Sequence, residues 1–279
     1  MFKIVQVDAF TSKLFGGNPA AVVVLDDWID DVVLQSIAAE NNLAETSFLV
    51  PIQQGWELRW FTPTAEVALC GHATLAAAHA LVTELGCTNR VLNFVTRESG
   101  TLVVECRANG ALTMSFPAIA VSTFADAQLI PAALGSVPLS VLRGHYSSDQ
   151  FDLMAVFESE DVVAGLKPDI ALLKNIQSRG VIATARGGSC DFISRYFAPN
   201  FGIYEDPVTG SAHCLLAPYW GDVLGKQQMD ARQISQRGGE IHCELINDRV
   251  MLTGYAVNFL VGTITVSYTH LTLPTIYSV

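Results

Sequence analysis

The chain has 279 residues, half of them apolar, and a formal net charge of −11. This length and composition predict a folded protein of one large or two ordinary domains and exclude a disordered chain. The acidic excess, with no basic block to offset it, argues against nucleic acid and anionic membranes as partners. No stretch provides the ~20 consecutive apolar residues of a membrane span, so we expect no membrane partner.

The first part of the chain predicts two helices among short strands. Apolar runs at residues 4–7 and 20–25 flank the turn-forming segment Gly16-Gly17-Asn18-Pro19. Apolar residues at helical spacing predict a helix over residues 28–42, and a strand follows over 47–50. Glu45 then falls in the connection between them, where functional side chains are often placed. Residues 71–85, apolar on all sides, predict a buried helix.

The rest of the chain repeats this plan. Strand-like runs at residues 91–95, 102–106 and 111–116 close the first half, and residues 117–128 have the character of a linker. The second half predicts strands at 153–157, 181–185 and 192–197, a helix from about residue 210, and further strands between 232 and 266. We therefore predict domains over residues 1–117 and 128–266. Residues 267–279 contain no Asp, Glu, Lys or Arg and fit neither half, which indicates a tail of artefactual origin.

Two pairs of motifs indicate an internal duplication. Arg59-Trp60-Phe61-Thr62-Pro63 resembles Arg195-Tyr196-Phe197-Ala198-Pro199, and the helix start Gly71-His72-Ala73-Thr74 resembles Gly210-Ser211-Ala212-His213. The spacing agrees closely, because 136 residues separate the two arginines and 139 separate the two glycines. Two matches in the same order favour two copies of one structural unit.

The duplicated helix starts predict a binding site for an anion. The first N–H groups of a helix lack partners within it and lie at the positive end of its dipole. Gly71 and Gly210 would let a ligand approach the backbone closely. Equally, small residues at these points would let a central helix pack inside a sheet. If the two helix starts face each other between the domains, they form a pocket for the carboxylate of a small molecule.

Candidate acid–base groups lie close to these helix starts in the sequence. His72 is at the first helix start, Asp206 shortly precedes the second, and Glu45 comes from the connection described above. A carboxylate in an apolar enclosure has a raised pKa and can act as acid or base near neutral pH. Each residue also has a structural interpretation: a solvated loop charge, a core histidine or an Asp-Pro turn. Ser211 suits a helix cap as well as a ligand contact.

The sequence predicts neither a metal nor a cofactor. The six cysteines lack the spacing of a disulfide framework, and no Cys-x-x-Cys or His-Glu-x-x-His motif is present, so we expect free thiols. There is no phosphate-binding loop and no Gly-x-Gly-x-x-Gly, and no lysine for a pyridoxal Schiff base lies within a motif. Because the chain opens as a strand and not as a signal peptide, we expect a cytoplasmic protein.

Five motifs stand in order along the chain: Gln6-Val7-Asp8-Ala9-Phe10-Thr11 with Gly16-Gly17-Asn18-Pro19-Ala20, Asn42-Leu43-Ala44-Glu45-Thr46-Ser47-Phe48, Arg59-Trp60-Phe61-Thr62-Pro63, Cys70-Gly71-His72-Ala73-Thr74, and Glu205-Asp206-Pro207-Val208-Thr209-Gly210-Ser211-Ala212-His213. Over roughly residues 1–265 the chain thereby resembles the PhzF-like family of phenazine biosynthesis. The resemblance implies the α+β fold of diaminopimelate epimerase: two pseudo-symmetric domains, each a curled, mostly antiparallel sheet around a central helix. It also implies a homodimer.

The resemblance further implies a cofactor-independent isomerase that shifts a proton on a small carboxylate substrate, similar to the isomerase of trans-2,3-dihydro-3-hydroxyanthranilate. Glu45 would transfer the proton, while His72, Asp206 and Ser211 would hold the substrate and assist proton movement. Backbone contacts to the substrate would come from the two helix starts, at Gly71, Ala73, Gly210 and Ala212.

Two rival functions stay open on the sequence. An amino-acid epimerase, racemase or dehydratase would use Cys70 as a base. Two-base enzymes of this fold carry a cysteine at each helix start, whereas the second position here is Thr209, and a hydroxyl is a far weaker base than a thiolate. This favours a one-base reaction through Glu45, with Cys70 as a small buried residue. Alternatively, a non-catalytic protein that binds small molecules would keep the same scaffold.

Overall fold

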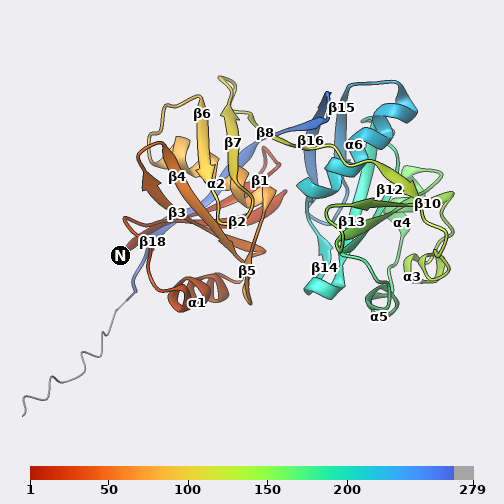
Figure 1. The fold of residues 1–279 in the computed structure, drawn as a ribbon, viewed down its shortest axis with the longest axis horizontal. Helices are drawn as coiled ribbons and strands as arrows, with labels where there is room; N and C mark the ends of the chain where they lie inside the picture. The colour runs from red at the N-terminus through yellow and green to blue at the C-terminus, as the bar shows by residue number, and fades with distance from the viewer. Residues whose placement is uncertain (267–279) are drawn as a thin grey trace, which may run out of the picture.

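The structure, a computed structural model, describes residues 1–266 and arranges them in two halves that lie side by side (Figure 1). The first half comprises β1 (Phe2–Ala9), β2 (Asn18–Val24), α1 (Asp31–Asn41), β3 (Glu45–Ile52), β4 (Gly55–Phe61), β5 (Glu66–Val67), α2 (Gly71–Glu84), β6 (Val91–Val95), β7 (Thr101–Cys106) and β8 (Leu112–Pro117). The second comprises β9 (Val121–Thr123), α3 (Ile130–Leu134), β10 (Ser140–His145), β11 (Phe151–Val156), α4 (Glu160–Gly165), α5 (Ile170–Lys174), β12 (Gly180–Arg186), β13 (Phe192–Ala198), a short 3-10 turn (Pro199–Phe201), β14 (Ile203–Asp206), α6 (Gly210–Leu224), β15 (Gln228–Gln233), β16 (Gly239–Ile246) and β17 (Arg249–Gly254). The last strand, β18 (Ala256–Ile264), lies in the first half.

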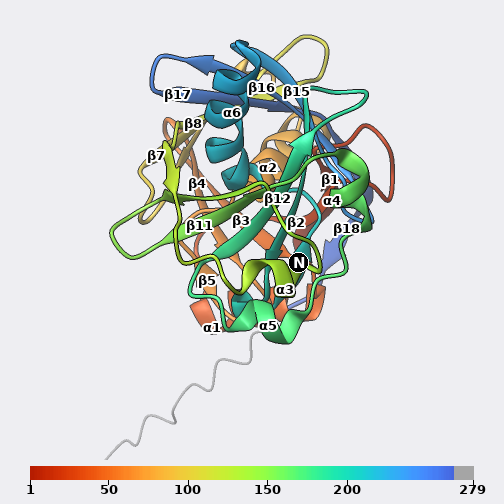
Figure 2. The same ribbon diagram turned by 90° about the vertical axis from the view of Figure 1, so that its right-hand side faces the viewer.

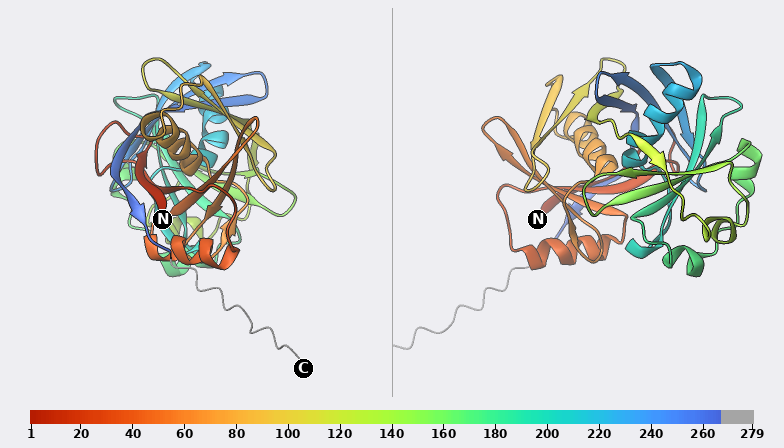
Figure 3. Two further views of the ribbon diagram at one scale, coloured as in Figure 1. Left: turned by 90° about the vertical axis from the view of Figure 1, so that its left-hand side faces the viewer. Right: turned by 45° about the vertical axis from the view of Figure 1, so that its right-hand side comes forward.

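Each half is built around one buried helix. The Ala- and Leu-rich α2 contacts β1, β2, β3, β7, β8 and β18, and these strands curl around it (Figure 3). In the second half α6 contacts β15, β16 and β17 (Figure 2). Both helices carry apolar side chains on every side, and most of their residues are buried, as expected of a helix enclosed by a sheet. The predicted α+β architecture, a curled sheet around a central helix in each half, is therefore confirmed.

The two halves share one strand pattern. In the first half, β2 runs parallel to β3 and β3 antiparallel to β4. In the second half, β11 runs parallel to β12 and β12 antiparallel to β13. The connection between the parallel strands is helical in both, through α1 in one and through α4 and α5 in the other. The duplication indicated by the sequence motifs is thus a duplication of structure.

Two strand pairings join the halves. β8 and β17 are antiparallel, with Leu112 opposite Gly254 and Pro117 opposite Arg249. β18 then returns to the first half and pairs along β1, from Phe2 opposite Ile264 to Ala9 opposite Ala256. This pairing satisfies backbone groups of β1 that would otherwise lie at a sheet edge. The domain limits 1–117 and 128–266 stay a prediction, and the last described strand belongs to the sheet of the first half.

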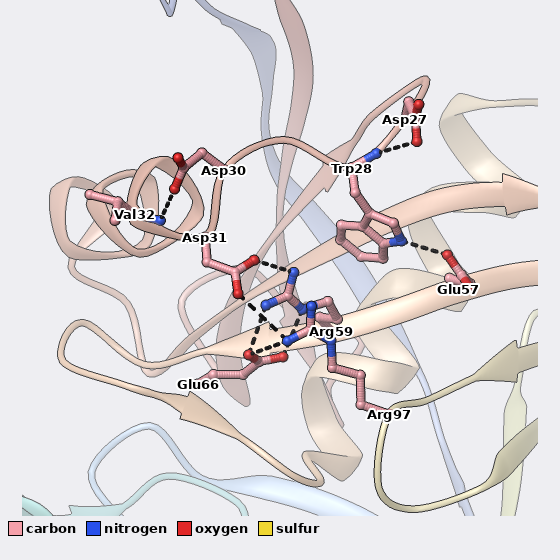
Figure 4. Close-up of polar contacts among 9 residues, drawn as sticks. All are labelled: Asp27, Trp28, Asp30, Asp31, Val32, Glu57, Arg59, Glu66 and Arg97. Atoms are coloured by element: carbon pink, nitrogen blue, oxygen red, sulfur yellow. Dashed lines mark hydrogen bonds and ion pairs between the residues drawn. The ribbon is translucent and has the colours of Figure 1, made fainter.

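The repeated arginine motif has a structural role in both halves. Arg59 on β4 is 3% exposed, and its guanidinium lies between Glu66 and Asp31, the first residue of α1 (Figure 4). Arg195 on β13 holds Glu205 with two hydrogen bonds and donates Nη1 to two carbonyl groups at the end of α4. Each arginine therefore ties a strand to a helix on the outer face of its sheet.

Several details differ from the sequence-based expectation. Glu45 is not in a connection but is the first residue of β3, because its backbone pairs with Ala20 of β2. The expected linker contains β9, which pairs with β10. The short helices α3, α4 and α5 escaped prediction because five or six residues are too few for a helical period to show. The predicted tail, 267–279, lies outside the described residues. Within residues 1–266, no helix is both long and apolar enough to cross a membrane.

Candidate active site

Five elements bring polar side chains to the place where the two central helices meet. Glu45 and Asn18 are the first residues of the neighbouring strands β3 and β2. His72 lies in the first turn of α2, Asp206 ends β14, and Thr209 is the N-cap residue of α6. Since α2 and α6 contact each other, these side chains from distant parts of the sequence converge.

Glu45 and His72 form the centre of the site. The Nε2 of His72 lies 3.1 Å from Oε2 of Glu45, and the two side chains are only 8% and 12% exposed. The other ring nitrogen, Nδ1, lies 3.4 Å from Sγ of Cys70. His72 Nε2 and Glu45 Oε2 are both buried without a well-aligned hydrogen bond in the described structure. Each of these two atoms can therefore still form a hydrogen bond with a ligand placed between them.

Asn18 connects this pair to the second half, a role that sequence reasoning missed. The fully buried Asn18 amide donates to Oδ1 of Asp206 and to the carbonyl of Val208, each at 2.9 Å, and lies 3.3 Å from Nδ1 of His72. Its Oδ1 has no partner among the described residues. The sequence feature that could have indicated this role is the position of Asn18, a polar residue within the Gly-Gly-Asn-Pro turn.

Asp206 is held in a second set of hydrogen bonds. Besides Asn18, it accepts a short hydrogen bond from the Thr209 hydroxyl. Gln233 completes the set by donating to the backbone carbonyl of Asp206 at 2.7 Å and accepting from the backbone N–H of Thr209 at 2.9 Å. Burial raises the pKa of Asp206 to about 6, against the opposing effects of the His72 charge and the Thr209 hydrogen bond. Asp206 therefore changes charge close to neutral pH.

The pKa values of His72 and Cys70 are both raised, but for different reasons. Burial opposes a charge on His72, but the neighbouring Cys70 and Glu45 groups outweigh it and raise the pKa of His72 well above its ordinary value. Burial, reinforced by the Glu45 charge, raises the pKa of the Cys70 thiol. The centre of the site thus places Nε2 of His72 3.1 Å from Oε2 of Glu45, with the buried Cys70 thiol beside the other ring nitrogen. Such a pair can take up a proton at one point and return it at another.

The other predicted site residues are distributed around this centre. Ser211 lies in the first turn of α6 and is not its N-cap, and its Oγ accepts a hydrogen bond from Nη2 of Arg179 at 2.9 Å. Within residues 1–266, no hydrogen bond joins Ser211 to Glu45, His72 or Asp206.

The backbone positions predicted to contact substrate differ in their surroundings. Ala73 and Ala212 are completely buried. A Cβ added at Gly71 or Gly210 would meet only Phe116 or Leu252, at 3.7 and 3.8 Å, which are ordinary contacts. Packing within the protein therefore does not require glycine at either helix start. This leaves the close approach of a ligand as a reason for glycine there.

Comparison with known proteins identifies the family of this chain. The family model for phenazine biosynthesis-like proteins matches residues 7–262. The chain belongs to the phenazine biosynthesis-like family. An uncharacterised isomerase of Pseudomonas aeruginosa is 48% identical over 262 residues, which cover 94% of this chain and 98% of that protein.

Solved structures agree with this family and with the fold. The crystal structure of a PhzF-family phenazine biosynthesis protein from Enterococcus faecalis superposes with a TM-score of 0.89 at 41% identity, covering 95% of this chain and 99% of that one. A predicted epimerase from Pseudomonas aeruginosa superposes with a TM-score of 0.76 at 19% identity, covering 96% of this chain and all of that one. The second likeness shows the shared epimerase fold alone.

Among residues 1–266, the side chains that could together hold a metal ion are the same central residues. Glu45, Cys70 and His72 offer ligand atoms that all lie within 4.8 Å of one another. However, His72 faces Cys70 with Nδ1 and Glu45 with Nε2, on opposite sides of its ring. A histidine normally coordinates a metal ion through one nitrogen. The arrangement therefore suits a chain of proton donors and acceptors better than a common metal centre.

Proposed function

We propose that this protein is a cofactor-independent isomerase that moves a proton on a small carboxylate substrate through Glu45. The supporting observation is the Glu45–His72 pair, buried at the junction of the two halves with unsatisfied atoms facing each other. The similarity to proteins named isomerases supports the same reaction class.

In this proposal Glu45, as a carboxylate, accepts a proton from a carbon made acidic by conjugation. The resulting carboxylic acid then returns that proton to another carbon of the same substrate, so no proton is gained or lost overall. His72, as an imidazolium, stabilises negative charge that develops on the substrate and keeps Glu45 oriented. Asn18, which is bonded to Asp206 of the second half, lies 3.3 Å from Nδ1 of His72 and limits the movement of the imidazole ring.

The test is proton NMR in heavy water with trans-2,3-dihydro-3-hydroxyanthranilate as the probe. The wild-type protein should incorporate deuterium, and Glu45→Gln should lose about 10²- to 10⁴-fold in rate, as expected for removal of a general base. Full activity in the variant would exclude Glu45 as the proton-transferring group. No incorporation by either protein would reject this substrate and favour the non-catalytic binding function.

A second candidate is an epimerase or racemase that uses Cys70 as its base. The contact between the Cys70 thiol and His72 Nδ1, at 3.4 Å, favours it, because such pairs activate thiols elsewhere. Two observations count against it. The pKa of the Cys70 thiol is raised, and Thr209 occupies the corresponding N-cap position of α6. Glu45 therefore stays the preferred base.

We also propose a homodimer in the cytoplasm, as the family resemblance implied. The edge strand β18 supports a dimer, since Phe259, Leu260 and Val261 are 44–49% exposed in a row. The free cysteines of the described chain are compatible with a reducing compartment. Light scattering of the purified protein tests the dimer, and a monomer at micromolar concentration would contradict it.

A further inference from the structure

A second cluster of polar side chains lies at the start of α6, outside the Glu45–His72 pair. The carboxylate of Asp152 is completely buried and accepts hydrogen bonds from Nε and Nη2 of Arg179, at 3.0 and 2.7 Å. The hydroxyls of Tyr146 and Tyr196 lie 2.8 and 3.2 Å from the same carboxylate. The guanidinium also stacks 3.9 Å above the ring of Tyr146. Arg179 is therefore fixed from two sides.

This cluster occupies the place that the duplication assigns to Glu45. Glu45 lies opposite Ala20 in the parallel pair β2–β3, and Gly180 lies opposite Asp152 in the corresponding pair β11–β12. A side chain at Gly180 is excluded, because a Cβ there would lie 2.3 Å from the Tyr196 hydroxyl. The second half thus lacks a counterpart of Glu45 and presents the adjacent Arg179 instead.

Ser211 is the counterpart of His72 in the same comparison, since Gly210 corresponds to Gly71. Nη2 of Arg179 donates to Oγ of Ser211 at 2.9 Å. Because Oγ already accepts this bond, the hydroxyl proton of Ser211 remains available for donation to another group. Within residues 1–266, Nη1 of Arg179 makes no hydrogen bond, and the side chain is 23% exposed.

Unsatisfied polar atoms at the Glu45–His72 pair could also bind a ligand's polar groups. Asn18 Oδ1, Glu45 Oε2 and His72 Nε2 are buried and unsatisfied in the described structure. Tyr196 connects the two clusters, because its hydroxyl contacts Asp152 while its backbone lies opposite Asp206 in β13–β14. A guanidinium, a hydroxyl and the first turn of a helix together recognise a carboxylate.

We propose that Arg179, through its own charge and by orienting the Ser211 hydroxyl, selects substrates with a carboxylate and holds that carboxylate at the start of α6. The two pseudo-symmetric helix starts then have different tasks: the start of α2 carries the acid–base pair, and the start of α6 carries the anion site. This inference rests on the proposed function for the placement of the reacting carbon beside Glu45. The proposal assigns Arg179 a specificity-determining role and Asp152 a positioning role.

The test compares two probes that differ only in charge, anthranilate and anthranilamide, by calorimetry and by NMR of the ¹⁵N-labelled protein. The wild type should bind anthranilate more tightly and shift the Nε–H signal of Arg179. Ser211→Ala removes only the hydroxyl. Arg179→Gln combined with Asp152→Asn replaces the ion pair with a neutral pair that can still form hydrogen bonds, and so avoids an unpaired buried charge.

Loss of a charged hydrogen-bond donor should weaken anthranilate binding by about tenfold to a hundredfold in the double variant. Binding of anthranilamide should change little, and Arg179→Lys should restore part of the preference for the carboxylate. The matched control is Arg195→Gln with Glu205→Gln, which neutralises a similar two-bond ion pair on the outer face of the same half. It should leave both affinities unchanged.

Equal binding of the two probes by the wild type, absence of anthranilate binding, or an unchanged preference in the double variant would each overturn the proposal. Its failure is distinguishable from failure of the proposed function, because these readouts need no turnover. The proposed function is tested separately by hydrogen exchange in Glu45→Gln. A protein that loses exchange in Glu45→Gln while showing no carboxylate preference would keep the isomerase proposal and reject the anion site.

Discussion

At the scale of single residues, the two carboxylates of the candidate site differ in their surroundings. Glu45 faces the imidazole of His72 and keeps one oxygen without a well-aligned hydrogen bond. Asp206 receives hydrogen bonds from Asn18 and Thr209 and is thereby fixed. The free oxygen suits a group that exchanges protons with a substrate, whereas the bound carboxylate suits a group that holds the site together.

Asp206 gives the first prediction, a pH dependence. Its pKa is raised to about 6, so it is ionised above this pH and protonated below it. A protonated Asp206 loses acceptor capacity for Asn18 and Thr209, which should disturb His72. We expect kcat/KM for trans-2,3-dihydro-3-hydroxyanthranilate to fall below about pH 6, and Asp206→Asn to be less active and to lack this fall. A wild-type profile that is flat between pH 5 and 7 would contradict the assignment.

Cys70 gives the second prediction. Because burial raises the pKa of its thiol, Cys70 stays protonated at neutral pH and contributes little as a base. Cys70→Ser should therefore keep its exchange rate within about tenfold of the wild type, well short of the 10²- to 10⁴-fold typical of a lost general base. The rates are measured by the same deuterium exchange, with Glu45→Gln as the inactive reference. Inactivity of Cys70→Ser in a folded protein would restore the thiol-base mechanism.

At the scale of elements, the turn before β2 is what places Asn18. Arg237, from the connection between β15 and β16, donates to the carbonyls of Gly16 and Gly17 and to the buried carboxylate of Asp8. The N–H of Gly17 in turn donates to the carbonyl of Gly238 at 2.8 Å. A loop of the second half therefore fixes the turn of the first half that carries Asn18.

Gly17 gives the third prediction. Its φ of +63° lies in the left-handed region, and a Cβ there would lie 2.1 Å from the carbonyl oxygen of Ala9. Gly17→Ala should lose about 1–3 kcal/mol of unfolding free energy from backbone strain alone and more from the clash. Gly100 is the matched control, with a φ of +68° and open space around its Cβ position. In urea denaturation Gly100→Ala should lose clearly less, and equal losses would contradict the packing described here.

At the scale of the whole molecule, two buried groups give opposite pH dependences of stability. Burial lowers the pKa of His213 from 6.5 to about 4. The unfolded chain then binds more protons between pH 4 and 6.5, so His213 makes stability rise with pH by up to roughly 3 kcal/mol. The pKa of Asp206 is raised from 3.8 to about 6. The folded protein then binds more protons, so Asp206 makes stability fall by a similar amount as pH rises from about 4 to 6.

The fourth prediction follows from the opposite effects of His213 and Asp206 on the pH dependence of stability. His213→Asn keeps a donor for the carbonyl of Thr209 but removes the titration, so the unfolding free energy of this variant should fall as pH rises from 4 to 6. Asp206→Asn removes the opposing group, so stability should rise more steeply with pH than in the wild type. Urea denaturation at several pH values measures both slopes. Identical slopes in the two variants would contradict the assigned burial effects.

The sequence by itself determined those parts of the molecule that depend on local pattern. The apolar run Val91–Val95 is a strand with the predicted limits, and the Ala-rich segment from Gly71 is the buried helix α2. The repeated motifs indicated two similar halves, because each copy has to form the same strand and helix start. In these cases neighbouring residues alone specify the structure, through periodicity and backbone preference.

Only the tertiary structure decided which residues meet. Asn18 contacts Val208, 190 residues away, and no local pattern records this contact. Likewise, Ser211 has the sequence context of a partner for Glu45, but Arg179 holds its hydroxyl. The return of β18 to β1 also depends on unpaired backbone groups at the far end of the chain. Local pattern fixes each element, while the functional site arises where elements from both halves bury their polar groups against one another.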